Sequence, residues 1–331
     1  MTRLRFLCGA FMCLALPATG ADGSATRFEV PAWLFPVPPP AVAPTAPATA
    51  PVDPHVLRVP GSNRAYTQAE IKDYFAAPDW HPGAHPPMPE VVAHGRRPDL
   101  YACGFCHLPD GAGRPENATL AGLPAGYIVD QMAAFASGAR RSAWSGPTYL
   151  PTDLMAKSAA QVSRAEIADA AAYFSSLRLQ RPRTEVIESD RVPRTRPVAW
   201  IYAREKGAGD EPLGHRLLEM PRDFERHELR DSRAEYVAYV PRGSLARGRK
   251  LAMDGTAAVP PCTACHGPDL RGLGLGPPIA GRSPTYLLRQ LVAFRTGARQ
   301  TREGAPMKPV VDVLTLDEMI AVAAYAGTLA P

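Results

Sequence analysis

The sequence contains few cysteines, no long apolar run and little excess charge. The apolar run Phe6–Leu16 is shorter than the roughly 20 residues that a membrane-spanning helix needs, and no other run is long enough either. Basic residues exceed acidic ones only by 37 to 32, which is too slight a surplus to indicate nucleic-acid binding. We therefore expect no transmembrane segment and no nucleic-acid partner.

The N-terminus has the layout of a secretory signal peptide. Arg3 and Arg5 precede the apolar run, and small residues follow it at 18–21. A buried N-terminal helix is the alternative interpretation. We predict a signal peptide over residues 1–21, cleaved near Ala21, which places the mature protein in the periplasm.

Four of the six cysteines lie in two copies of one pentapeptide; the other two, Cys8 and Cys13, would be lost with the signal peptide. Cys103-Gly104-Phe105-Cys106-His107 recurs 159 positions later as Cys262-Thr263-Ala264-Cys265-His266. Two thiols three residues apart can each bond a vinyl group of one haem, and the next imidazole then reaches the iron. The sequence thus predicts two covalently bound haem c groups, with the four thiols as attachment points and His107 and His266 as axial iron ligands.

Two other chemistries use paired cysteines. A four-cysteine zinc site usually keeps its pairs about 15–20 residues apart and has no use for a histidine after each pair. A thioredoxin-like redox pair needs a βαβ context, and the flanking sequence shows no such pattern. The haem interpretation is therefore preferred, and the internal repeat supports it.

The repeat extends beyond the pentapeptides. Residues 127–135 match residues 286–294 at the same offset of 159, and both stretches have helix start and stop signals. Further on the offset becomes 152, and capping boxes at 163–166 and 315–318 open a last helix in each half. Two mainly α-helical units of the same design are expected.

The order of these features resembles a class I cytochrome c domain: a haem motif, a tyrosine-rich helix ending in Gly-Ala-Arg, a lone methionine and a closing amphipathic helix. Two such domains in tandem resemble the dihaem cytochrome c4 type, over roughly residues 90–177 and 242–331. The resemblance implies that an N-terminal helix packs on the last helix of each domain through a glycine and an aromatic residue. The matching pairs are Gly248 with Tyr325 and Gly95 with Tyr173.

The repeat also selects candidates for the sixth iron ligand. Met155 and Met307 match at the offset of 152, and each is expected in a loop, where packing gives no reason to retain a thioether. A soft sulfur ligand completes His/Met iron and raises its reduction potential. Met132 and Met319 instead align with aliphatic residues and are expected in the core. We predict Met155 and Met307 as axial ligands.

Other side chains remain as alternatives for the sixth position. Loop histidines are more often solvated than bound to a metal, so these alternatives are less favoured. They are His81, His85 and His94 ahead of the first haem motif, and His215 and Met220 between the halves.

The halves differ where the iron-bound histidine should find its hydrogen-bond acceptor. The stretch 277–281 resembles the family's Pro-x-Leu-Ala-Gly turn, in which a proline carbonyl accepts that bond. The first half has Ala118 where the second has Pro277. The missing proline leaves the partner of His107 open, and we expect the two haems to be inequivalent.

Two further stretches have unusual compositions: one is rich in proline and the other in arginine. Residues 31–54 hold nine prolines and favour an extended spacer, although Trp33 and Phe35 leave a docking strap open. The arginine-rich stretch after residue 177 contains possible short strands at 198–202 and 236–240. The predicted divisions are a signal peptide (1–21), a proline-rich extended segment (22–65), cytochrome c domain 1 (66–177), a linker (178–241) and cytochrome c domain 2 (242–331).

The combined prediction is a periplasmic dihaem c-type cytochrome that carries electrons between redox proteins, and it can equally be the cytochrome subunit of a dehydrogenase. A periplasmic dehydrogenase or a terminal oxidase is the expected partner. No catalytic residue is predicted, because the haem supplies the redox chemistry. The alternative is a dihaem enzyme, either a peroxidase, which needs an open iron position, or a thiosulfate dehydrogenase, which often uses a cysteine ligand.

Overall fold

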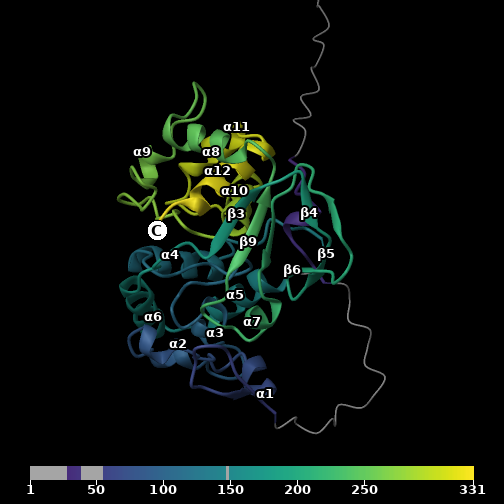
Figure 1. The fold of residues 1–331 in the computed structure, drawn as a ribbon. Helices are drawn as coiled ribbons and strands as arrows, with labels where there is room; N and C mark the ends of the chain where they lie inside the picture. Colours follow the sequence, from purple (N-terminus) through teal and green to yellow (C-terminus); the bar gives the residue numbers. More distant parts are fainter. Residues whose placement is uncertain (1–27, 39–54, 147–148) are drawn as a thin grey trace, which may run out of the picture.

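The computed structural model describes residues 28–38, 55–146 and 149–331 (Figure 1). The predicted signal peptide and the stretch 39–54 lie outside the described residues. Within the described residues, none of the helices combines the length and the apolar character needed to cross a bilayer. Figure 1 shows residues 66–177, here called the first half, below residues 242–331, the second half. Residues 178–241, here called the inserted segment, lie along one flank of both.

The helices of the first half surround its pentapeptide. They are α1 (Gln68–Lys72), α2 (Glu90–Ala93), α3 (Cys103–His107), α4 (Ala125–Ala136), α5 (Leu150–Gln161) and α6 (Arg164–Ser176). The capping box at the start of α6 is confirmed: the Ser163 side chain accepts from the Glu166 N–H, and the Glu166 carboxylate accepts from the Ser163 N–H. This exchange satisfies backbone donors that a helix start leaves free, so it sets where α6 begins.

The second half repeats this plan with a longer first helix. Its helices are α8 (Ser244–Met253), α9 (Thr263–His266), α10 (Pro284–Arg295), α11 (Met307–Val313) and α12 (Leu316–Thr328). Gly248 of α8 lies so close to α12 that a Cβ atom there would fall 2.0 Å from the Ala321 carbonyl oxygen and 2.8 Å from the Tyr325 Cβ. The predicted packing of Gly248 on Tyr325 is confirmed, because only a residue without a side chain permits this approach.

The corresponding prediction for the first half is wrong. Gly95 follows the four-residue α2, and a Cβ atom there would meet the Leu100 carbonyl oxygen at 2.2 Å, not Tyr173. The Tyr173 hydroxyl instead donates to the Pro109 carbonyl at 2.7 Å. Prolines at 86, 87 and 89 exclude a longer helix before α2, so the described part of the first half has no helix equivalent to α8.

The inserted segment, predicted as a linker with possible strands, folds into small β-sheets and one short helix. Its elements are β3 (Thr184–Glu188), β4 (Arg191–Pro193), β5 (Thr195–Val198), β6 (Ile201–Arg204), β7 (Asp210–Pro212), β8 (Leu218–Pro221), α7 (Phe224–Glu228) and β9 (Tyr236–Val240). In the three-stranded sheet β3-β9-β8, the central β9 is parallel to β3 and antiparallel to β8.

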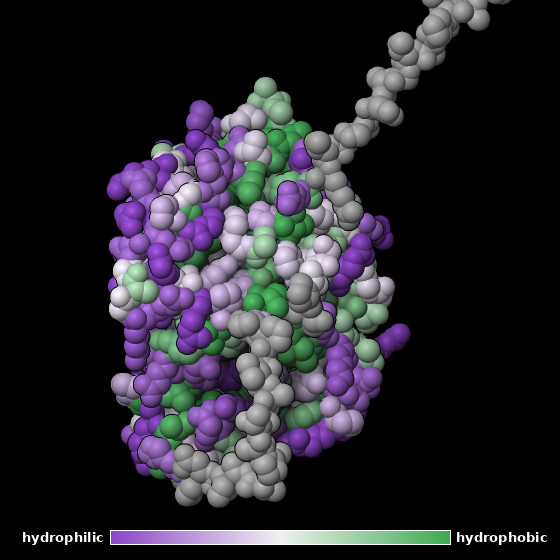
Figure 2. All heavy atoms as spheres, turned by 90° about the vertical axis from the view of Figure 1, so that its right-hand side faces the viewer, coloured by the Kyte–Doolittle hydropathy of each residue, from purple (hydrophilic) through white to green (hydrophobic). Residues whose placement is uncertain are grey.

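One of the two expected strands in this segment is confirmed and the other is not. The run 236–240 is β9, and four of its five residues are buried. The run 198–202 instead turns back as the β5–β6 hairpin, with positive φ at Ala199 (47°) and Trp200 (73°). The pattern over 198–202 spans the end of β5, the turn and the start of β6, and does not mark one strand. Figure 2 shows the flank that carries β4, β5 and β6, with polar side chains at the margins and hydrophobic ones between them.

The N-terminal strap, residues 28–38, docks on the rest of the molecule. Leu34 and Phe35 are 1% and 4% exposed and belong to the core of the second half. The Arg289 Nε–H donates to the Leu34 carbonyl at 2.8 Å, and the Tyr202 hydroxyl donates to the Trp33 carbonyl at 2.8 Å. For residues 31–38 the favoured prediction of a spacer is wrong, and the alternative of a docking strap is confirmed. The free energy gained by burying the aromatic and aliphatic side chains outweighs the preference of the prolines for an extended, solvated chain.

Candidate haem sites

The first pentapeptide forms α3, a single helical turn that presents its side chains to a cavity. Cys103, Cys106 and His107 all line this cavity. The His107 Nδ1–H donates to the Ala118 carbonyl at 2.8 Å, which leaves Nε2 as the atom available to a metal. Burial lowers the pKa of His107 to about 4. The ring is therefore neutral near pH 7, as an iron ligand must be.

The second pentapeptide, at the start of α9, has the same arrangement. The His266 Nδ1–H donates to the Pro277 carbonyl at 2.8 Å, and burial also lowers the pKa of this histidine. The partner of His107, which the missing proline left open in the sequence, is the Ala118 carbonyl. Ala118 occupies the place of Pro277 and accepts the bond at the same distance, because the acceptor is a backbone carbonyl and the proline ring takes no part in the bond.

The loops after the two pentapeptides are held by matching backbone hydrogen bonds. In the first half, the N–H groups of Leu120 and Ala121 both donate to the Gly111 carbonyl, at 2.8 and 3.0 Å. In the second half, the N–H groups of Ile279 and Ala280 donate to the Leu270 carbonyl at the same two distances. This shared loop geometry places each acceptor carbonyl beside its histidine.

Both pentapeptides line one cavity of about 780 Å³, and its walls fit covalently bound haem. The volume lies in the range of pockets that hold large organic ligands. Each histidine leaves one ring nitrogen without a partner among the residues that the structure describes, beside two thiols that can form thioether links. Arg114 Nε and Arg299 Nε are buried without a partner in the described residues, and such donors suit an anionic propionate.

The two predicted methionine ligands both line this cavity. Met155 lies within α5 and Met307 is the first residue of α11, so the expectation that they lie in loops is wrong. The connection between the middle and last helix of each half is long enough to form a helix of its own, and that helix forms one wall of the cavity. Met319, by contrast, is fully buried in the core as predicted. The matching expectation for Met132 is wrong, because Met132 is only partly buried and lines the cavity.

None of the alternative sixth ligands belongs to the cavity lining. His81 Nε2 bonds Asp231 Oδ1 at 2.9 Å, and His85 Nε2 bonds Asp79 Oδ1 at 3.2 Å. The two exposed histidines and the methionine also lie elsewhere. His94 contacts Glu90, His215 contacts Asp317, and Met220 is buried in the core of the inserted segment.

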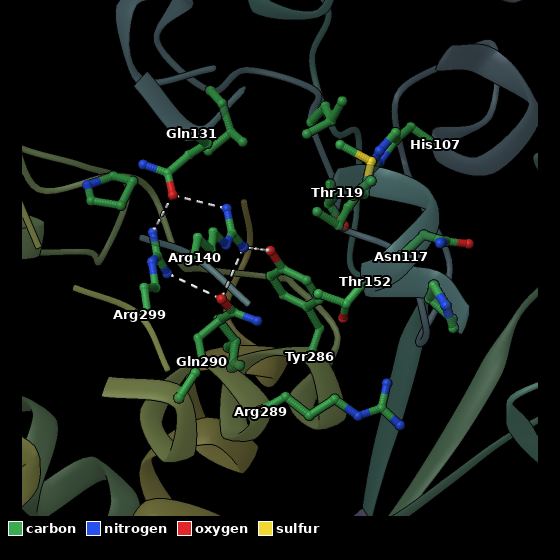
Figure 3. Close-up of a pocket in the computed structure, with 18 of the residues that line it drawn as sticks. His107, Asn117, Thr119, Gln131, Arg140, Thr152, Tyr286, Arg289, Gln290 and Arg299 are labelled. Atoms are coloured by element: carbon green, nitrogen blue, oxygen red, sulfur yellow. Dashed lines mark hydrogen bonds between the residues drawn. The ribbon is translucent and has the colours of Figure 1, made fainter. Parts of the chain in front are cut away.

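A polar network joins the two halves across the cavity, and residue-by-residue reasoning on the sequence missed it (Figure 3). Arg140 donates to Gln131 of its own half at 2.9 Å and to Tyr286 and Gln290 of the other half at 2.7 and 2.9 Å. Arg299 mirrors it. Its bonds reach Gln290 at 3.1 Å, Gln131 at 3.0 Å and Tyr127 at 2.7 Å.

This network contains two buried guanidinium groups and no carboxylate. Burial, followed by the nearby charge of Arg140, lowers the pKa of Arg299. Buried charges are normally compensated by an opposite charge, so the site suits anionic groups such as haem propionates. The signal in the sequence was the Gly-Ala-Arg that ends at 140 and again at 299.

Comparison with known proteins places these features among cytochromes. The family model described as Cytochrome c matches residues 245–330. The chain is 38% identical over 65 residues to cytochrome c-554(548) of Halomonas halodenitrificans, covering 19% of this chain and 78% of that protein. It is 28% identical over 228 residues to cytochrome c4 of Azotobacter vinelandii, covering 67% of this chain and 82% of that one.

Longer matches include proteins whose names refer to thiosulfate dehydrogenase. The chain is 29% identical over 234 residues to a thiosulfate dehydrogenase electron acceptor of Stutzerimonas stutzeri, covering 70% of this chain and 80% of that protein. Among solved structures, the thiosulfate dehydrogenase TsdBA of Marichromatium purpuratum matches with 28% identity and a TM-score of 0.44. That match covers 70% of this chain and only 37% of the larger protein.

Proposed function

The chain belongs to the cytochrome c family, and from this premise we propose that it binds two covalent haems in two class I cytochrome c domains, 66–177 and 242–331. It is a c-type cytochrome that carries electrons. The observation that supports two haems is the equivalence of the two sites: each pentapeptide faces the shared cavity, and each histidine donates to a backbone carbonyl at 2.8 Å.

The residues of the chain bind and orient the haem. Cys103, Cys106, Cys262 and Cys265 would form the thioether links to bound haem. The carbonyl acceptors fix both imidazole planes and increase the basicity of the ligating nitrogens. Bound haem supplies a one-electron ferric–ferrous couple.

Met155 and Met307 are proposed as the second axial ligands. Both line the cavity, and both belong to helices that form its wall. Thioether ligation favours the ferrous state relative to a second imidazole and so raises the reduction potential. An iron with both axial positions filled has no open site for a substrate, which supports a carrier over a peroxidase. The free cysteines of the described residues all belong to the pentapeptides, which leaves no cysteine for the thiosulfate-enzyme pattern.

We propose periplasmic redox proteins as partners. The similarity to thiosulfate dehydrogenase electron acceptors supports a dehydrogenase as the donor, and a terminal oxidase suits the role of final acceptor. Export to the periplasm rests on the signal-peptide layout of residues 1–21. Both pentapeptides line one cavity, so bound haems would lie close enough together for electrons to pass between them inside one molecule.

The test is a haem count with matched variants. An alkaline pyridine spectrum of the wild-type chain should give two haems per chain. The double variants Cys103→Ala/Cys106→Ala and Cys262→Ala/Cys265→Ala should each retain one. The reduced wild-type protein should bind carbon monoxide only slowly at neutral pH and show negligible peroxide turnover. One haem per wild-type chain would overturn the proposal, and rapid carbon monoxide binding would favour the enzyme.

A further inference from the structure

The loops that follow the two pentapeptides have the same shape and opposite exposure. Residues 113–117 and 272–276 match at the offset of 159, and each is closed by a short backbone bridge. In the second half, Leu273 and Leu275 are 57% and 80% exposed. At the position equivalent to Leu275 the first half has Glu116, which is 7% exposed.

The cysteines of the two pentapeptides and the residues beside them differ in exposure in the same way. Ala264 and Cys265 of the second pentapeptide are exposed. Their counterparts, Phe105 and Cys106, are buried and partly buried. A haem attached through Cys265 would therefore lie next to exposed residues, and one attached through Cys106 would lie next to buried ones.

The inserted segment supplies this cover. The Arg230 guanidinium lies 3.4 Å over the Phe105 ring, and its Nη1 donates to the Phe105 carbonyl at 3.0 Å. Arg114, in the loop after the first pentapeptide, donates to the His227 carbonyl at 3.4 Å. In Figure 1, α3 lies beside α7, while α9 lies at the outer edge of the molecule.

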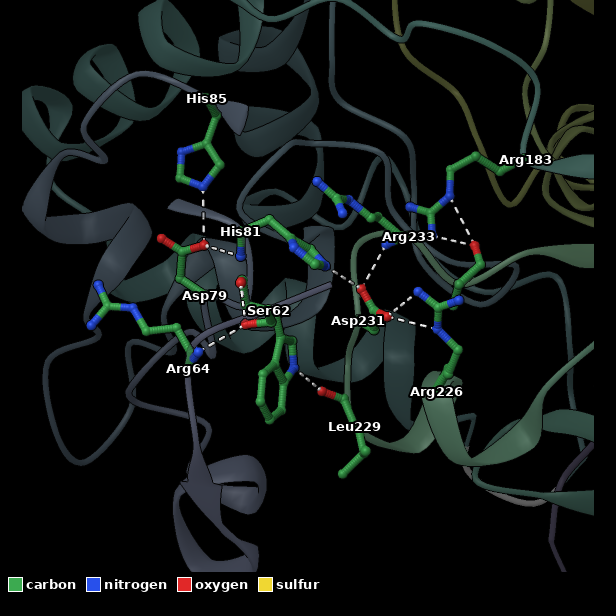
Figure 4. Close-up of polar contacts among 12 residues, drawn as sticks. Ser62, Arg64, Asp79, His81, His85, Arg183, Arg226, Leu229, Asp231 and Arg233 are labelled. Carbon is green, nitrogen blue, oxygen red and sulfur yellow. Dashed lines mark hydrogen bonds and ion pairs between the residues drawn. The ribbon is translucent and has the colours of Figure 1, made fainter. Parts of the chain in front are cut away.

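A buried polar cluster fixes the cover in place (Figure 4). The Trp80 Nε1–H donates to the Leu229 carbonyl at 2.6 Å. The Asp231 carboxylate accepts from His81 Nε2 at 2.9 Å and from Arg226 Nε at 2.7 Å. These bonds attach the residues after α7 to the loop ahead of the first pentapeptide, so the cover is joined to the first half by buried hydrogen bonds.

We infer that the second half is the electron port of the molecule. Electrons enter and leave at the port surface, formed by Ala264, Cys265, Leu273 and Leu275, and the first haem exchanges electrons only through the second. The physical reason is that electron transfer slows steeply with the distance between redox groups, and the cover keeps partners away from the first haem. This inference rests on the proposed binding of two haems.

The electron balance of the port is simple. With haem bound, a reduced partner would give one electron to the ferric second haem, which would become ferrous while the partner is oxidised. That electron would then reduce the ferric first haem and restore the second to the ferric state. A further electron could then enter, so the covered first haem would store one electron inside the molecule.

The charge pattern of the port indicates its partner. Residues 263–276 contain one acidic and one basic side chain, Asp269 and Arg271, so their charges cancel. Exposed leucines beside a haem attachment site complement an uncharged apolar surface. The partner is therefore a one-electron redox protein whose contact surface around its own cofactor is apolar and uncharged.

The first test uses stopped-flow reduction by an anionic inorganic reductant, ferrocyanide or dithionite, on protein with two haems confirmed by the pyridine assay. Leu275→Glu should slow reduction by about tenfold, because a like charge at the port repels the anion. Val313→Glu adds the same charge at an exposed position of α11 outside the cavity lining and should leave the rate unchanged. Equal rates for wild type and Leu275→Glu would overturn the port while leaving the electron carrier intact.

A second readout requires no electron transfer. A soluble gadolinium chelate should broaden the NMR signals of the methyl groups of the second haem and spare those of the first, assigned with the single-haem variants. Arg230→Ala, which removes part of the cover, should make the first haem sensitive to the chelate. Equal broadening of both haems in the wild type would overturn the inference. Self-association abolished by Leu275→Glu would also overturn it, because the port surface would then be an interface between copies of the chain.

Discussion

The two halves stabilise the same haem site with different surroundings. In the second half, α8 crosses α12 at Gly248, and the contact comes from within the repeat unit. In the first half α2 has four residues, and the support comes from Trp80 and from the inserted segment. Yet the backbone hydrogen bonds to the two histidine carbonyls are nearly the same. The Gly113 N–H donates to the His107 carbonyl at 2.9 Å, and the Gly272 N–H donates to the His266 carbonyl at 2.8 Å. The haem-binding turn is therefore a local unit that tolerates different packing around it.

The strongest test of this equivalence concerns the methionine ligands. Met307→Ala should abolish the weak sulfur-to-iron absorption band of the second haem, and Met155→Ala that of the first, each with a lowered reduction potential. Visible spectroscopy and redox titration measure both effects. Met319→Leu is the control, because Met319 is fully buried in the core away from the cavity. If Met319→Leu removed a band, the alignment of the two halves would be wrong.

The next largest effect should come from removing the support of the first half. Trp80 is 2% exposed and donates to the Leu229 carbonyl, so Trp80→Ala should lower the free energy of unfolding by about 3–5 kcal/mol. Guanidinium denaturation measures the loss of stability. Haem absorption should show that the surroundings of the first haem unfold at a lower denaturant concentration than in the wild type. Val56→Ala, at a position 46% exposed, should change little. An equal loss at both haems would contradict the separate support of the halves.

The matching change in the second half is Gly248→Ala. The added Cβ would collide with the Ala321 carbonyl, so the free energy of unfolding should fall by about 2 kcal/mol. Gly126→Ala is a matched control in α4, because no atom lies within 4 Å of the added Cβ. It should be neutral or stabilising by up to about 1 kcal/mol. A Gly248→Ala protein as stable as the wild type would show that the close approach of α8 and α12 is not required.

The smallest expected effect is a loss of stability at low pH, caused by protonation of Asp231. Burial raises the pKa of Asp231, but bonds from the Arg233 N–H, Arg226 and His81 outweigh it, and the net pKa is lowered. A carboxylate with a lowered pKa stabilises the fold above its unfolded pKa of about 3.9 and loses that contribution as pH falls through the folded pKa. The first half should thus lose about 1 kcal/mol of stability below pH ~4, the order of one hydrogen bond.

Denaturation at several pH values measures this loss. Asp231→Asn should start at a lower stability and lack the acid-dependent step, because an amide does not titrate in this range. A wild-type first half that became more stable as pH fell below 4 would contradict the assignment.

Local chemistry made part of the structure predictable. The spacing Cys-x-x-Cys-His identifies a haem turn because its thiols and imidazole lie within one helical turn. The capping boxes at Ser163 and Thr315 mark helix starts because donor and acceptor are three residues apart. The Gly248–Tyr325 contact was the exception, since the family resemblance supplied it.

Long-range contacts account for what sequence reasoning missed. Arg140 meets Tyr286 across 146 positions, and Trp80 meets Leu229 across 149. Neither residue has a local pattern that identifies its partner, because such a bond depends on how separate elements are brought together.

The sequence alone therefore determined the haem motifs and the helix starts marked by a capping box or a first-turn proline, because each is set by atoms a few residues apart. Folding in three dimensions decided which haem site is covered, which residues join the halves and that Phe35 is buried. Those outcomes depend on the packing of segments far apart in the chain. Removing apolar surface from water is favourable for any pair of surfaces that come into contact, so it does not identify the pair in advance.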